Sequence, residues 1–383
     1  MGEKKTISTI CNVLNGFAFK SDKYVSSGTR VIRITNVQKG YVVDDDPKYY
    51  PESEMSQLGQ YILRENDLLM SLTGNVGRVG LLTKDLLPAA LNQRVACLRI
   101  KDSGVLLKYL FYYLNSDLFE KAAIFSASGI AQKNMSTEWL KKVEIPVPSV
   151  GKQQRIVDEL DLLTGIIDKK NAQLRDLDTL AQSIFYEMFG NPVTNDKGWP
   201  KKRIGELVHL YNGRAFKPTD WTESGLPIVR IQNLNSPDSP YNCYDGVVDE
   251  AYLLKGGELL YAWSGTPGTS FGAHIWKGEK AVLNQHIFKV LFDEKYLNKL
   301  YFLYQLNLSV SSLFDQTHGG VGLKHITKGT LENQLVPLPN MELQNSFAQK
   351  VLEIDSEKDR LKCSLLQTKA LLESRMSAYF NTK

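Results

Sequence analysis

The stretch VIRITNV, Val31–Val37, occurs a second time in diverged form as IVRIQNL, Ile228–Leu234. The sequence in front of each copy repeats as well. NGFAFKSDKYVSSGTR, starting at Asn15, aligns without a gap with NGRAFKPTDWTESGLP, starting at Asn212. Self-similarity on this scale indicates a duplicated structural unit.

The repeat extends in order along the chain. LLMSLTGNVG from Leu68 returns as LLYAWSGTPG from Leu259, and LNQ from Leu91 returns from Leu283. SGIAQKNMS, 128–136, returns as GGVGLKHIT, 319–327, and each half then reaches a Pro-x-Pro exit. Short β-rich runs, polar turns and one apolar helical stretch predict an α+β domain in each half. We interpret the opening stretch as one strand of this domain, with Arg33 and Arg230 inside it as structural arginines.

Each half ends in a segment without proline that predicts one long helix. The domain boundaries are therefore 1–148, 149–190, 191–339 and 340–383, which alternate domain, helix, domain, helix. Apolar residues at spacings of four and three predict that the two helices pair as an antiparallel coiled coil of roughly 50 Å. An internal pseudo-twofold axis would then relate the halves. The seam positions are Ile156, Leu160, Leu163, Ile167, Leu174, Leu177, Ile184, Phe347, Val351, Ile354, Leu361, Leu365 and Leu372. The alternative is that each helix packs on its own domain.

Composition limits the class of protein. The chain has 383 residues, 43% hydrophobic and 23% charged, which is typical of a globular protein. Four scattered cysteines with no CxxC pair indicate a reducing compartment without a disulfide or zinc framework, and five dispersed histidines predict no metal site. The absence of a long apolar run predicts a cytoplasmic protein without membrane contact. The net charge of +4 is too small to identify a nucleic-acid binder by itself.

Two short motifs resemble parts of catalytic sites. Asp46-Pro47-Lys48-Tyr49 is one residue from the D/N-P-P-Y/F box of amino-methyltransferases, but Lys48 replaces the second proline. The run 293–295, Asp-Glu-Lys, matches the end of a nuclease metal motif, but its Pro-Asp partner at 237–238 is remote. Neither motif recurs in the other half, and no phosphate loop, GxSxG or HExxH motif occurs. The chain is therefore predicted to be non-catalytic, with no cofactor of its own.

Binding is favoured instead by glycine-rich loops with polar or basic tips that occur in both halves. Arg, Lys, Asn and Gln make bidentate contacts with guanine and adenine edges, and glycine lets the backbone approach phosphates. Where the loop tips differ, the two halves could read different bases. The alternative is that these are ordinary solvated loops. The predicted DNA-binding residues are Lys20, Asn75, Arg78, Asn92, Gln93, Arg94, Ser128, Gln132, Lys133, Asn134, Lys217, Thr266, Thr269, Asn284, Gln285, His286, His318, Lys324 and His325.

The whole chain resembles the specificity subunits of type I restriction-modification enzymes. The most specific pieces are the FGNP…GWP junction, Phe189–Pro200, and the duplicated order of domain and helix. This resemblance implies that each domain is a target recognition domain that reads one half of a bipartite, asymmetric sequence in double-stranded DNA. It also implies that the coiled coil sets the spacing between the half-sites. Two methyltransferase subunits and the translocating restriction subunits would be the partners, carrying S-adenosylmethionine, ATP and Mg²⁺.

Two other hypotheses remain open from the residues. One is a recognition chain for a methylation-only system, which would need methyltransferase partners but no restriction subunit. The other is a duplicated scaffold that binds protein or carbohydrate, for which DNA affinity would be absent from the assembled complex.

Overall fold

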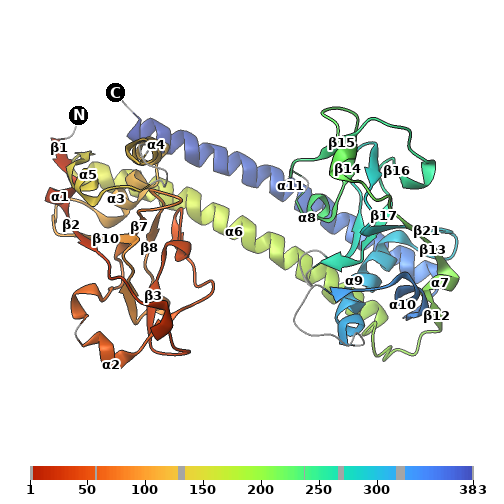
Figure 1. Ribbon diagram of the computed structural model, residues 1–383. Coiled ribbons are helices and arrows are strands. Elements are labelled where there is room, and N and C mark those ends of the chain that lie inside the picture. The colour runs from red at the N-terminus through yellow and green to blue at the C-terminus, as the bar shows by residue number, and fades with distance from the viewer. Residues whose placement is uncertain are drawn as a thin grey trace. The chain divides into compact units, whose positions relative to one another are not determined.

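A computed structural model describes residues 3–56, 58–127, 134–236, 238–265, 271–315 and 324–381. The chain forms two compact units (Figure 1). The first unit comprises Met1–Asn171 and Cys363–Lys383, and the second comprises Ala172–Lys362. Each unit therefore contains one copy of the β-rich domain together with part of both long helices.

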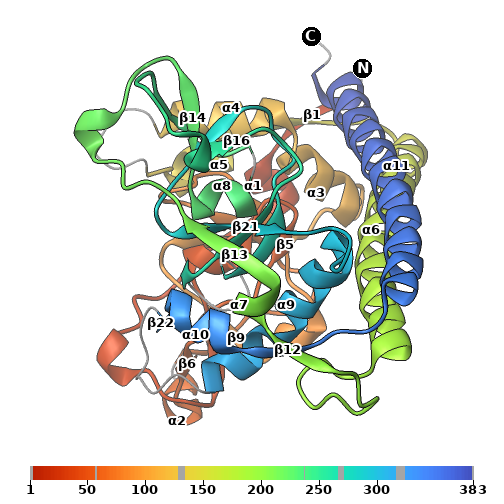
Figure 2. The same cartoon turned by 90° about the vertical axis from the view of Figure 1, so that its right-hand side faces the viewer.

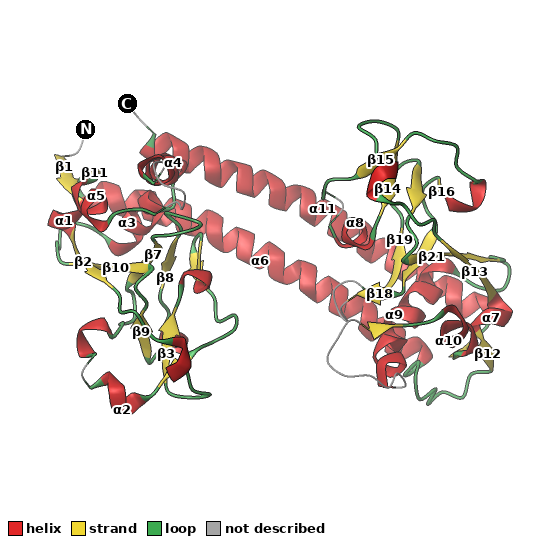
Figure 3. Ribbon diagram, in the orientation of Figure 1, coloured by secondary structure: helices red, strands yellow, loops and turns green. Residues whose placement is uncertain are grey.

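The first unit is built on a four-stranded antiparallel sheet in the order β2-β10-β7-β8 (Figure 3). A second sheet has the order β6-β3-β9, in which β3 and β9 run parallel, and two strand pairs, β1-β11 and β4-β5, complete the unit. The strands are β1 (Glu3–Thr6), β2 (Cys11–Asn15), β3 (Thr29–Ile32), β4 (Val37–Gln38), β5 (Tyr41–Val42), β6 (Tyr49–Tyr50), β7 (Leu68–Ser71), β8 (Val79–Leu81), β9 (Ala89–Leu91), β10 (Val95–Ile100) and β11 (Glu144–Val147). The helices of its domain are α1 (Ile7–Ile10), α2 (Glu52–Met55), α3 (Leu107–Leu114), α4 (Asp117–Ser126) and α5 (Thr137–Lys142).

The second unit repeats this topology. Its four-stranded sheet, β13-β21-β17-β19, matches β2-β10-β7-β8 strand for strand, and β14 and β20 form the parallel pair that β3 and β9 form in the first unit. The strands are β12 (Lys201–Arg203), β13 (Val208–Asn212), β14 (Leu226–Val229), β15 (Asn242–Tyr244), β16 (Leu253–Leu254), β17 (Leu259–Ala262), β18 (Ser264–Gly265), β19 (Gly272–Ile275), β20 (Ala281–Leu283), β21 (Ile287–Phe292), β22 (Lys324–His325) and β23 (Leu335–Pro337). The helices are α7 (Ile204–Leu207), α8 (Ile231–Asn235), α9 (Lys299–Asp315) and α10 (Lys328–Asn333). The predicted α+β duplication is confirmed.

The stretch that revealed the repeat is not one strand, which corrects the sequence interpretation. Strand β3 ends at Ile32, and Arg33 already lies beyond it. The reason is Asn36, whose side-chain oxygen accepts the backbone N–H of Arg33 at 2.9 Å and turns the chain into a helical turn. Asn233 accepts the N–H of Arg230 at 3.1 Å in the second copy. Both asparagines are buried, so the repeated Asn holds the turn in each unit.

The two long helices are α6 (Val150–Phe189) and α11 (Met341–Phe380), each of 40 residues. A rise of 1.5 Å per residue makes each about 60 Å long, somewhat longer than the sequence estimate. Within each unit they lie side by side and antiparallel, as Figures 1 and 2 show. Ile156, Leu160 and Leu163 are buried in the first unit, and Phe347, Val351 and Ile354 are buried in the second. The remaining predicted seam residues, Ile167, Leu174, Leu177, Ile184, Leu361, Leu365 and Leu372, are buried or half-buried.

Both helices also complete the domain cores. In the second unit Phe185, Phe189 and Phe347 are buried against Tyr301 of α9, with the rings of Phe189 and Tyr301 4.7 Å apart. In the first unit Phe380 fills the corresponding position beside Tyr109 of α3, at a ring separation of 5.7 Å. Each long helix thus packs both on a domain and on the other long helix. For this reason the boundaries of the compact units do not coincide with the junctions between domain and helix.

The junction that carries the family resemblance is a helix cap. Trp199 donates its indole N–H to the carbonyl of Phe189 at 2.9 Å, and the ammonium of Lys197 donates to the carbonyl of Glu187. These carbonyls belong to the last turn of α6, which has no helical partners for them. Gly190 adopts a positive φ of 77°, as is usual directly after a helix. The conspicuous sequence of this segment is therefore explained by the way α6 ends.

Among the residues that the structure describes, no helix is both long enough and apolar enough to cross a membrane.

Candidate nucleic-acid interface

Three of the predicted loops of the first unit meet at Leu72, which follows β7. The backbone N–H of Leu72 donates to the carbonyl of Arg94 at 3.0 Å, and the carbonyl of Leu72 accepts the N–H of Met135 at 2.8 Å. These bonds join the glycine-rich loop 72–78, the turn 91–94 and the segment that starts at Asn134. Loops that are distant in sequence are thus brought together at one end of the strands of the four-stranded sheet.

A fourth predicted segment reaches the same place through Gly16. The N–H of Phe17 donates to the carbonyl of Leu91, and the N–H of Gln93 donates to the carbonyl of Phe17, both at 2.9 Å. A Cβ atom on Gly16 would lie 2.2 Å from the carbonyl carbon of Asn92, so no other residue fits without moving the backbone. The repeated NG and LNQ motifs are therefore two sides of one contact, which explains why both recur together.

The second unit builds the same junction around Trp263. Its N–H donates to the carbonyl of His286 at 3.3 Å, and its carbonyl accepts the N–H of Ile326 at 3.2 Å. The close approach at Gly213 is also reproduced, since a Cβ atom there would lie 2.1 Å from the carbonyl oxygen of Asn284. The convergence is thus a property of the repeated domain and not an accident of one copy.

The predicted residues of the first unit that the structure describes lie at this junction, except Lys20, which follows Phe17 by three residues. Lys20, Gln93, Arg94 and Asn134 are exposed, and Asn92 is half-buried with its side-chain oxygen accepting the N–H of Arg94 at 3.2 Å. The tip residues therefore have side chains available to a ligand while the backbone below them is fixed. Three further predicted residues, Ser128, Gln132 and Lys133, lie outside the described residues.

Arg78 is anchored more firmly than a loop-tip residue. Its guanidinium donates to the side-chain oxygen of Gln38 at 2.6 Å, and it is half-buried. Asn75 is exposed, and with its amide oxygen turned toward Arg78 it accepts from the guanidinium at 3.2 Å. Arg78 therefore holds the glycine-rich loop to the β4–β5 hairpin and presents Asn75.

In the second unit the predicted residues are less exposed. Lys217 is exposed, but Asn284 is buried, and Gln285 and His286 are half-buried with their side-chain nitrogens 3.2 Å apart. The backbone of Lys324 and His325 forms β22, which pairs with β18. The predicted residues Thr266, Thr269 and His318 lie outside the described residues. Whether any of these side chains contacts DNA stays a prediction.

Trp263 is a candidate that the sequence analysis missed. Its indole N–H donates to the side-chain oxygen of Asn212 at 3.1 Å, and its ring centroid lies 5.3 Å from that of His286. Leu72 occupies the equivalent position in the first unit, so an aromatic side chain stands at this position in only one copy. The available signal was a tryptophan directly after a strand, at the start of a glycine-containing loop.

The motif Asp46-Pro47-Lys48-Tyr49 forms a surface ion-pair cluster. Lys48 pairs with Asp46 at 2.6 Å, and the same carboxylate pairs with Arg33 at 3.2 Å. Hydrogen bonds from Lys48 and then Arg33 hold the pKa of Asp46 below its usual value. The carboxylate is thus charged and already occupied by two cations, which suits a structural turn better than a catalytic loop.

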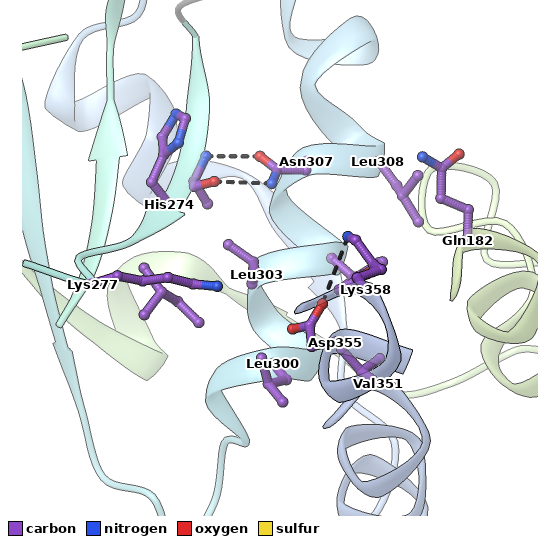
Figure 4. Close-up of a pocket in the computed structure, with 13 residues that line it drawn as sticks. Gln182, His274, Lys277, Leu300, Leu303, Asn307, Leu308, Val351, Asp355 and Lys358 are labelled. Atoms are coloured by element: carbon purple, nitrogen blue, oxygen red, sulfur yellow. Dashed lines mark hydrogen bonds and ion pairs between the residues drawn. The ribbon is translucent and has the colours of Figure 1, made fainter. Parts of the chain in front are cut away.

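The second unit has a pocket of about 350 Å³ that is built from other elements (Figure 4). It lies between β19, α9 and the two long helices, and Asn307 spans it by bonding both the N–H and the carbonyl of Ala273, at 2.7 and 3.0 Å. Burial lowers the pKa of His274, which keeps this lining residue neutral. The pocket shares no lining residue with the loop junction, so we do not assign it to the candidate interface.

The loop junctions and the turns beside them carry amide, guanidinium and ammonium groups on backbone that is fixed by hydrogen bonds. Side chains of these types can contact base edges and phosphates. Over the described part of the chain, no three histidine, cysteine, aspartate or glutamate residues are placed to hold a metal ion.

Comparisons with known proteins identify the family to which the chain belongs. The family model for the type I restriction modification DNA specificity domain matches residues 2–176 and 196–367. The EcoBI specificity subunit of Escherichia coli is 31% identical over 170 residues, which are 43% of this chain and 34% of that protein. The MjaVIII specificity subunit of Methanocaldococcus jannaschii is 24% identical over 370 residues, 87% of this chain and 84% of that protein.

The fold agrees with solved structures as well. The S subunit of a type I restriction-modification system from M. genitalium superposes with a TM-score of 0.50 at 14% identity, covering 98% of this chain and 94% of that one. At this identity the likeness concerns the fold alone. The two matches to the family model coincide with the two copies of the repeat, one in each half of the chain. The chain therefore belongs to the family of type I restriction-modification DNA specificity proteins.

Proposed function

We propose that this chain is the DNA-recognition subunit of a type I restriction-modification complex. Each unit reads one half of a bipartite, asymmetric site, and the paired helices α6 and α11 fix the spacing between the halves. The observation that carries the proposal is the loop junction at Leu72 and its copy at Trp263. The backbone frame is the same in both units, whereas the side chains on it differ, so two related readers with different base preferences are expected.

The helices supply the other half of the argument. Each continues unbroken from one unit into the other for 40 residues, about 60 Å. Since one turn of DNA measures about 34 Å, elements of this length suit half-sites one or more turns apart.

Catalysis is assigned to other chains. We propose that two methyltransferase subunits carry S-adenosylmethionine and that restriction subunits carry ATP and Mg²⁺, while this chain binds no cofactor and works in the cytoplasm. A base that is methylated must leave the helical stack to enter a catalytic pocket, so the chain that reads the sequence and the chain that reacts can be separate. Partner subunits would also neutralise part of the phosphate charge, which fits the modest net charge of +4.

A methylome tests the proposal. The chain is co-expressed with its methyltransferase subunit in a host without DNA methylation, and modified adenines are mapped across the DNA. The expected result is a single split motif with an unspecified gap of fixed length. Exchange of residues 1–148 for those of a relative should change one half of the motif and leave the other half and the gap unchanged.

Absence of methylation from a stable complex that also fails to bind DNA would contradict the proposal and favour the duplicated scaffold. A split motif without any restriction activity when all neighbouring subunits are present would favour the methylation-only system instead. Methylation by the isolated chain would show that it is catalytic.

A further inference from the structure

The mainly apolar seam between α6 and α11 is interrupted by three polar contacts that cross from one helix to the other. In the first unit the ammonium of Lys170 donates to the side-chain oxygens of Ser364 and Thr368, both at 2.7 Å, and to the carbonyl of Ser364 at 3.0 Å. All three N–H donors of this lysine are therefore used. A polar residue at a seam position is costly unless its partner is in place, so it favours one pairing of helices over others.

The other two contacts are ion pairs. In the second unit Lys358 pairs with Asp178 at 2.5 Å, and its side chain is only 19% exposed. In the first unit the guanidinium of Arg375 contacts both carboxylate oxygens of Glu159, one of them at 2.9 Å, and Tyr379 donates to the same carboxylate. Partial burial makes the loss of either partner more costly than at a fully exposed pair.

The repeat allows every residue of one helix to be placed on the other. Both helices have 40 residues, and the equivalent of an α6 residue lies 191 positions further on, the interval between Val150 and Met341. The buried glutamines obey this relation: Gln153 binds the N–H of Leu106, and Gln344 binds that of Asn298.

None of the three polar contacts is repeated. The equivalent of Lys170 is Leu361, that of Lys358 is Ile167, and that of Arg375 is Ile184. The apolar part of the seam is alike in both helices, whereas its polar part is not. An apolar seam alone would therefore distinguish poorly between three pairings. These are α6 with α11, α6 with the α6 of a second copy of the chain, and α11 with the α11 of a second copy.

The polar residues distinguish these possibilities by charge. If α11 paired with α11 of a second copy in the same register, Arg375 would face Lys350, the equivalent of Glu159. Lys358 would face Lys369, the equivalent of Asp178. Like charges brought together in this way oppose association.

Pairing of α6 with α6 is disfavoured for another reason. Lys170 would face Gln173 and Leu177, the equivalents of Ser364 and Thr368, and Glu159 would face Ile184. The bonds of the lysine would be lost, and a carboxylate would be placed against an apolar side chain without a counter-charge.

We propose that the Lys170, Lys358 and Arg375 contacts select the pairing of α6 with α11 and exclude pairing between like helices of two copies. They thereby oppose any dimer that is built on α6–α6 or α11–α11 pairing. The proposal concerns partner choice between helices and does not depend on DNA recognition, so its test can fail or succeed independently of the proposed function.

Charge reversal at Arg375 tests it in the full-length chain. In Arg375→Glu the new carboxylate repels Glu159 in the present pairing but attracts Lys350 in the α11–α11 pairing. Molar mass is measured by light scattering after size-exclusion chromatography over a range of concentrations. We expect a monomeric parent chain and a dimer of the variant, with the monomer–dimer equilibrium shifted about tenfold for each reversed pair. Lys358→Glu should add to the shift.

Two controls isolate the cause. The double variant Glu159→Arg/Arg375→Glu restores attraction across α6 and α11 and should return to the monomer. Arg360→Glu makes the same change in charge at a side chain that is 75% exposed on α11, and should leave the mass unchanged.

A second variant covers the case in which reversal at Arg375 prevents folding. Lys350→Glu/Lys369→Glu alters two exposed residues and none of the three contacts, yet it places opposite charges together in the α11–α11 pairing. It should therefore also promote dimers. A parent chain that is already a dimer, or folded forms of both variants that stay monomeric over the whole concentration range, would overturn the proposal.

Discussion

The two units differ in the side chains that face outward and agree in those that bind their own backbone. Tyr109 and Tyr301 both donate to a proline carbonyl, of Pro146 at 2.7 Å and of Pro337 at 2.8 Å. The loop junction, by contrast, carries Arg94 in one copy and His286 in the other. Framework and reading surface are thus separable sets of residues. A change to the framework should destabilise the unit that carries it, in either copy, whereas a change at the surface should affect the recognition of one half-site.

The strongest test of this comparison is the glycine contact. Gly16→Ala places a Cβ atom 2.2 Å from the backbone of Asn92, which cannot give way as a flexible side chain would. We expect a loss of about 3 kcal/mol or more in the free energy of unfolding of the first unit, measured by urea denaturation. Gly213→Ala should do the same in the second unit.

Gly59→Ala is the matched control, since nothing lies within 4 Å of a Cβ atom there. A Gly16→Ala chain as stable as Gly59→Ala would mean that the NG and LNQ contact is not part of the framework.

The buried glutamines should give the next largest effect. Gln153→Ala removes one acceptor from Leu106 N–H and two donors, to the carbonyls of Gly104 and Pro148. Leaving these buried groups without partners should cost about 2–3 kcal/mol of unfolding free energy. Gln344→Ala loses two such bonds, to the N–H of Asn298 and the carbonyl of Pro339, and should cost less. Equal costs, or a larger one at Gln344, would show that the bonds do not set the effect.

The reading surface should respond differently. Arg94→Ala removes an exposed guanidinium from the junction and leaves the backbone bond between Leu72 and residue 94 in place, so stability should be preserved. DNA affinity of the assembled methyltransferase complex should fall by about 1–3 kcal/mol, with discrimination relaxed in one half of the motif only. His286→Ala should relax the other half. Competition binding against DNAs altered in each half measures both, and loss of discrimination in both halves from one variant would break the comparison.

The smallest effect concerns pH at the helix seam. Hydrogen bonds from Arg375 and then Tyr379 lower the pKa of Glu159. A carboxylate whose pKa is lower in the folded state stabilises that state above its ordinary pKa, and this contribution disappears as the pH falls through the lowered value. Unfolding midpoints of the parent chain and Glu159→Gln should therefore differ at neutral pH and converge in acid. A constant difference would indicate that the carboxylate charge is not responsible.

The architecture could be predicted from the sequence because the two halves of the chain could be aligned with each other. Ordered matches identified two domains and two helices, and the apolar spacing identified the buried side of each helix. The sequence interpretation placed Arg33 inside a strand, however, because the Asn36 turn depends on a buried hydrogen bond. The conservation of this asparagine between the copies was the overlooked signal.

The candidate interface was predicted as separate loops and not as one surface. Its assembly depends on backbone bonds such as that between Leu72 and Met135, which join positions far apart and require no particular side chain. Gly16 and Gly213 occur at the same place in both copies, which indicates a close approach of the backbone to another segment. The sequence does not identify that segment, which is Asn92 in one unit and Asn284 in the other. Trp263 was missed because its equivalent, Leu72, is an ordinary apolar residue.

The division of the chain also bears on the order in which the protein is made. The second unit is continuous, 172–362, whereas the first needs residues 363–381 to finish its core, where Phe380 is 2% exposed. Because domains generally fold as they leave the ribosome, the recognition domain that is translated first must wait, with its core open beside Tyr109, until the second has been made. A nascent chain stalled before Cys363 should thus hold a finished second unit and an unfinished first one, the reverse of the order of synthesis.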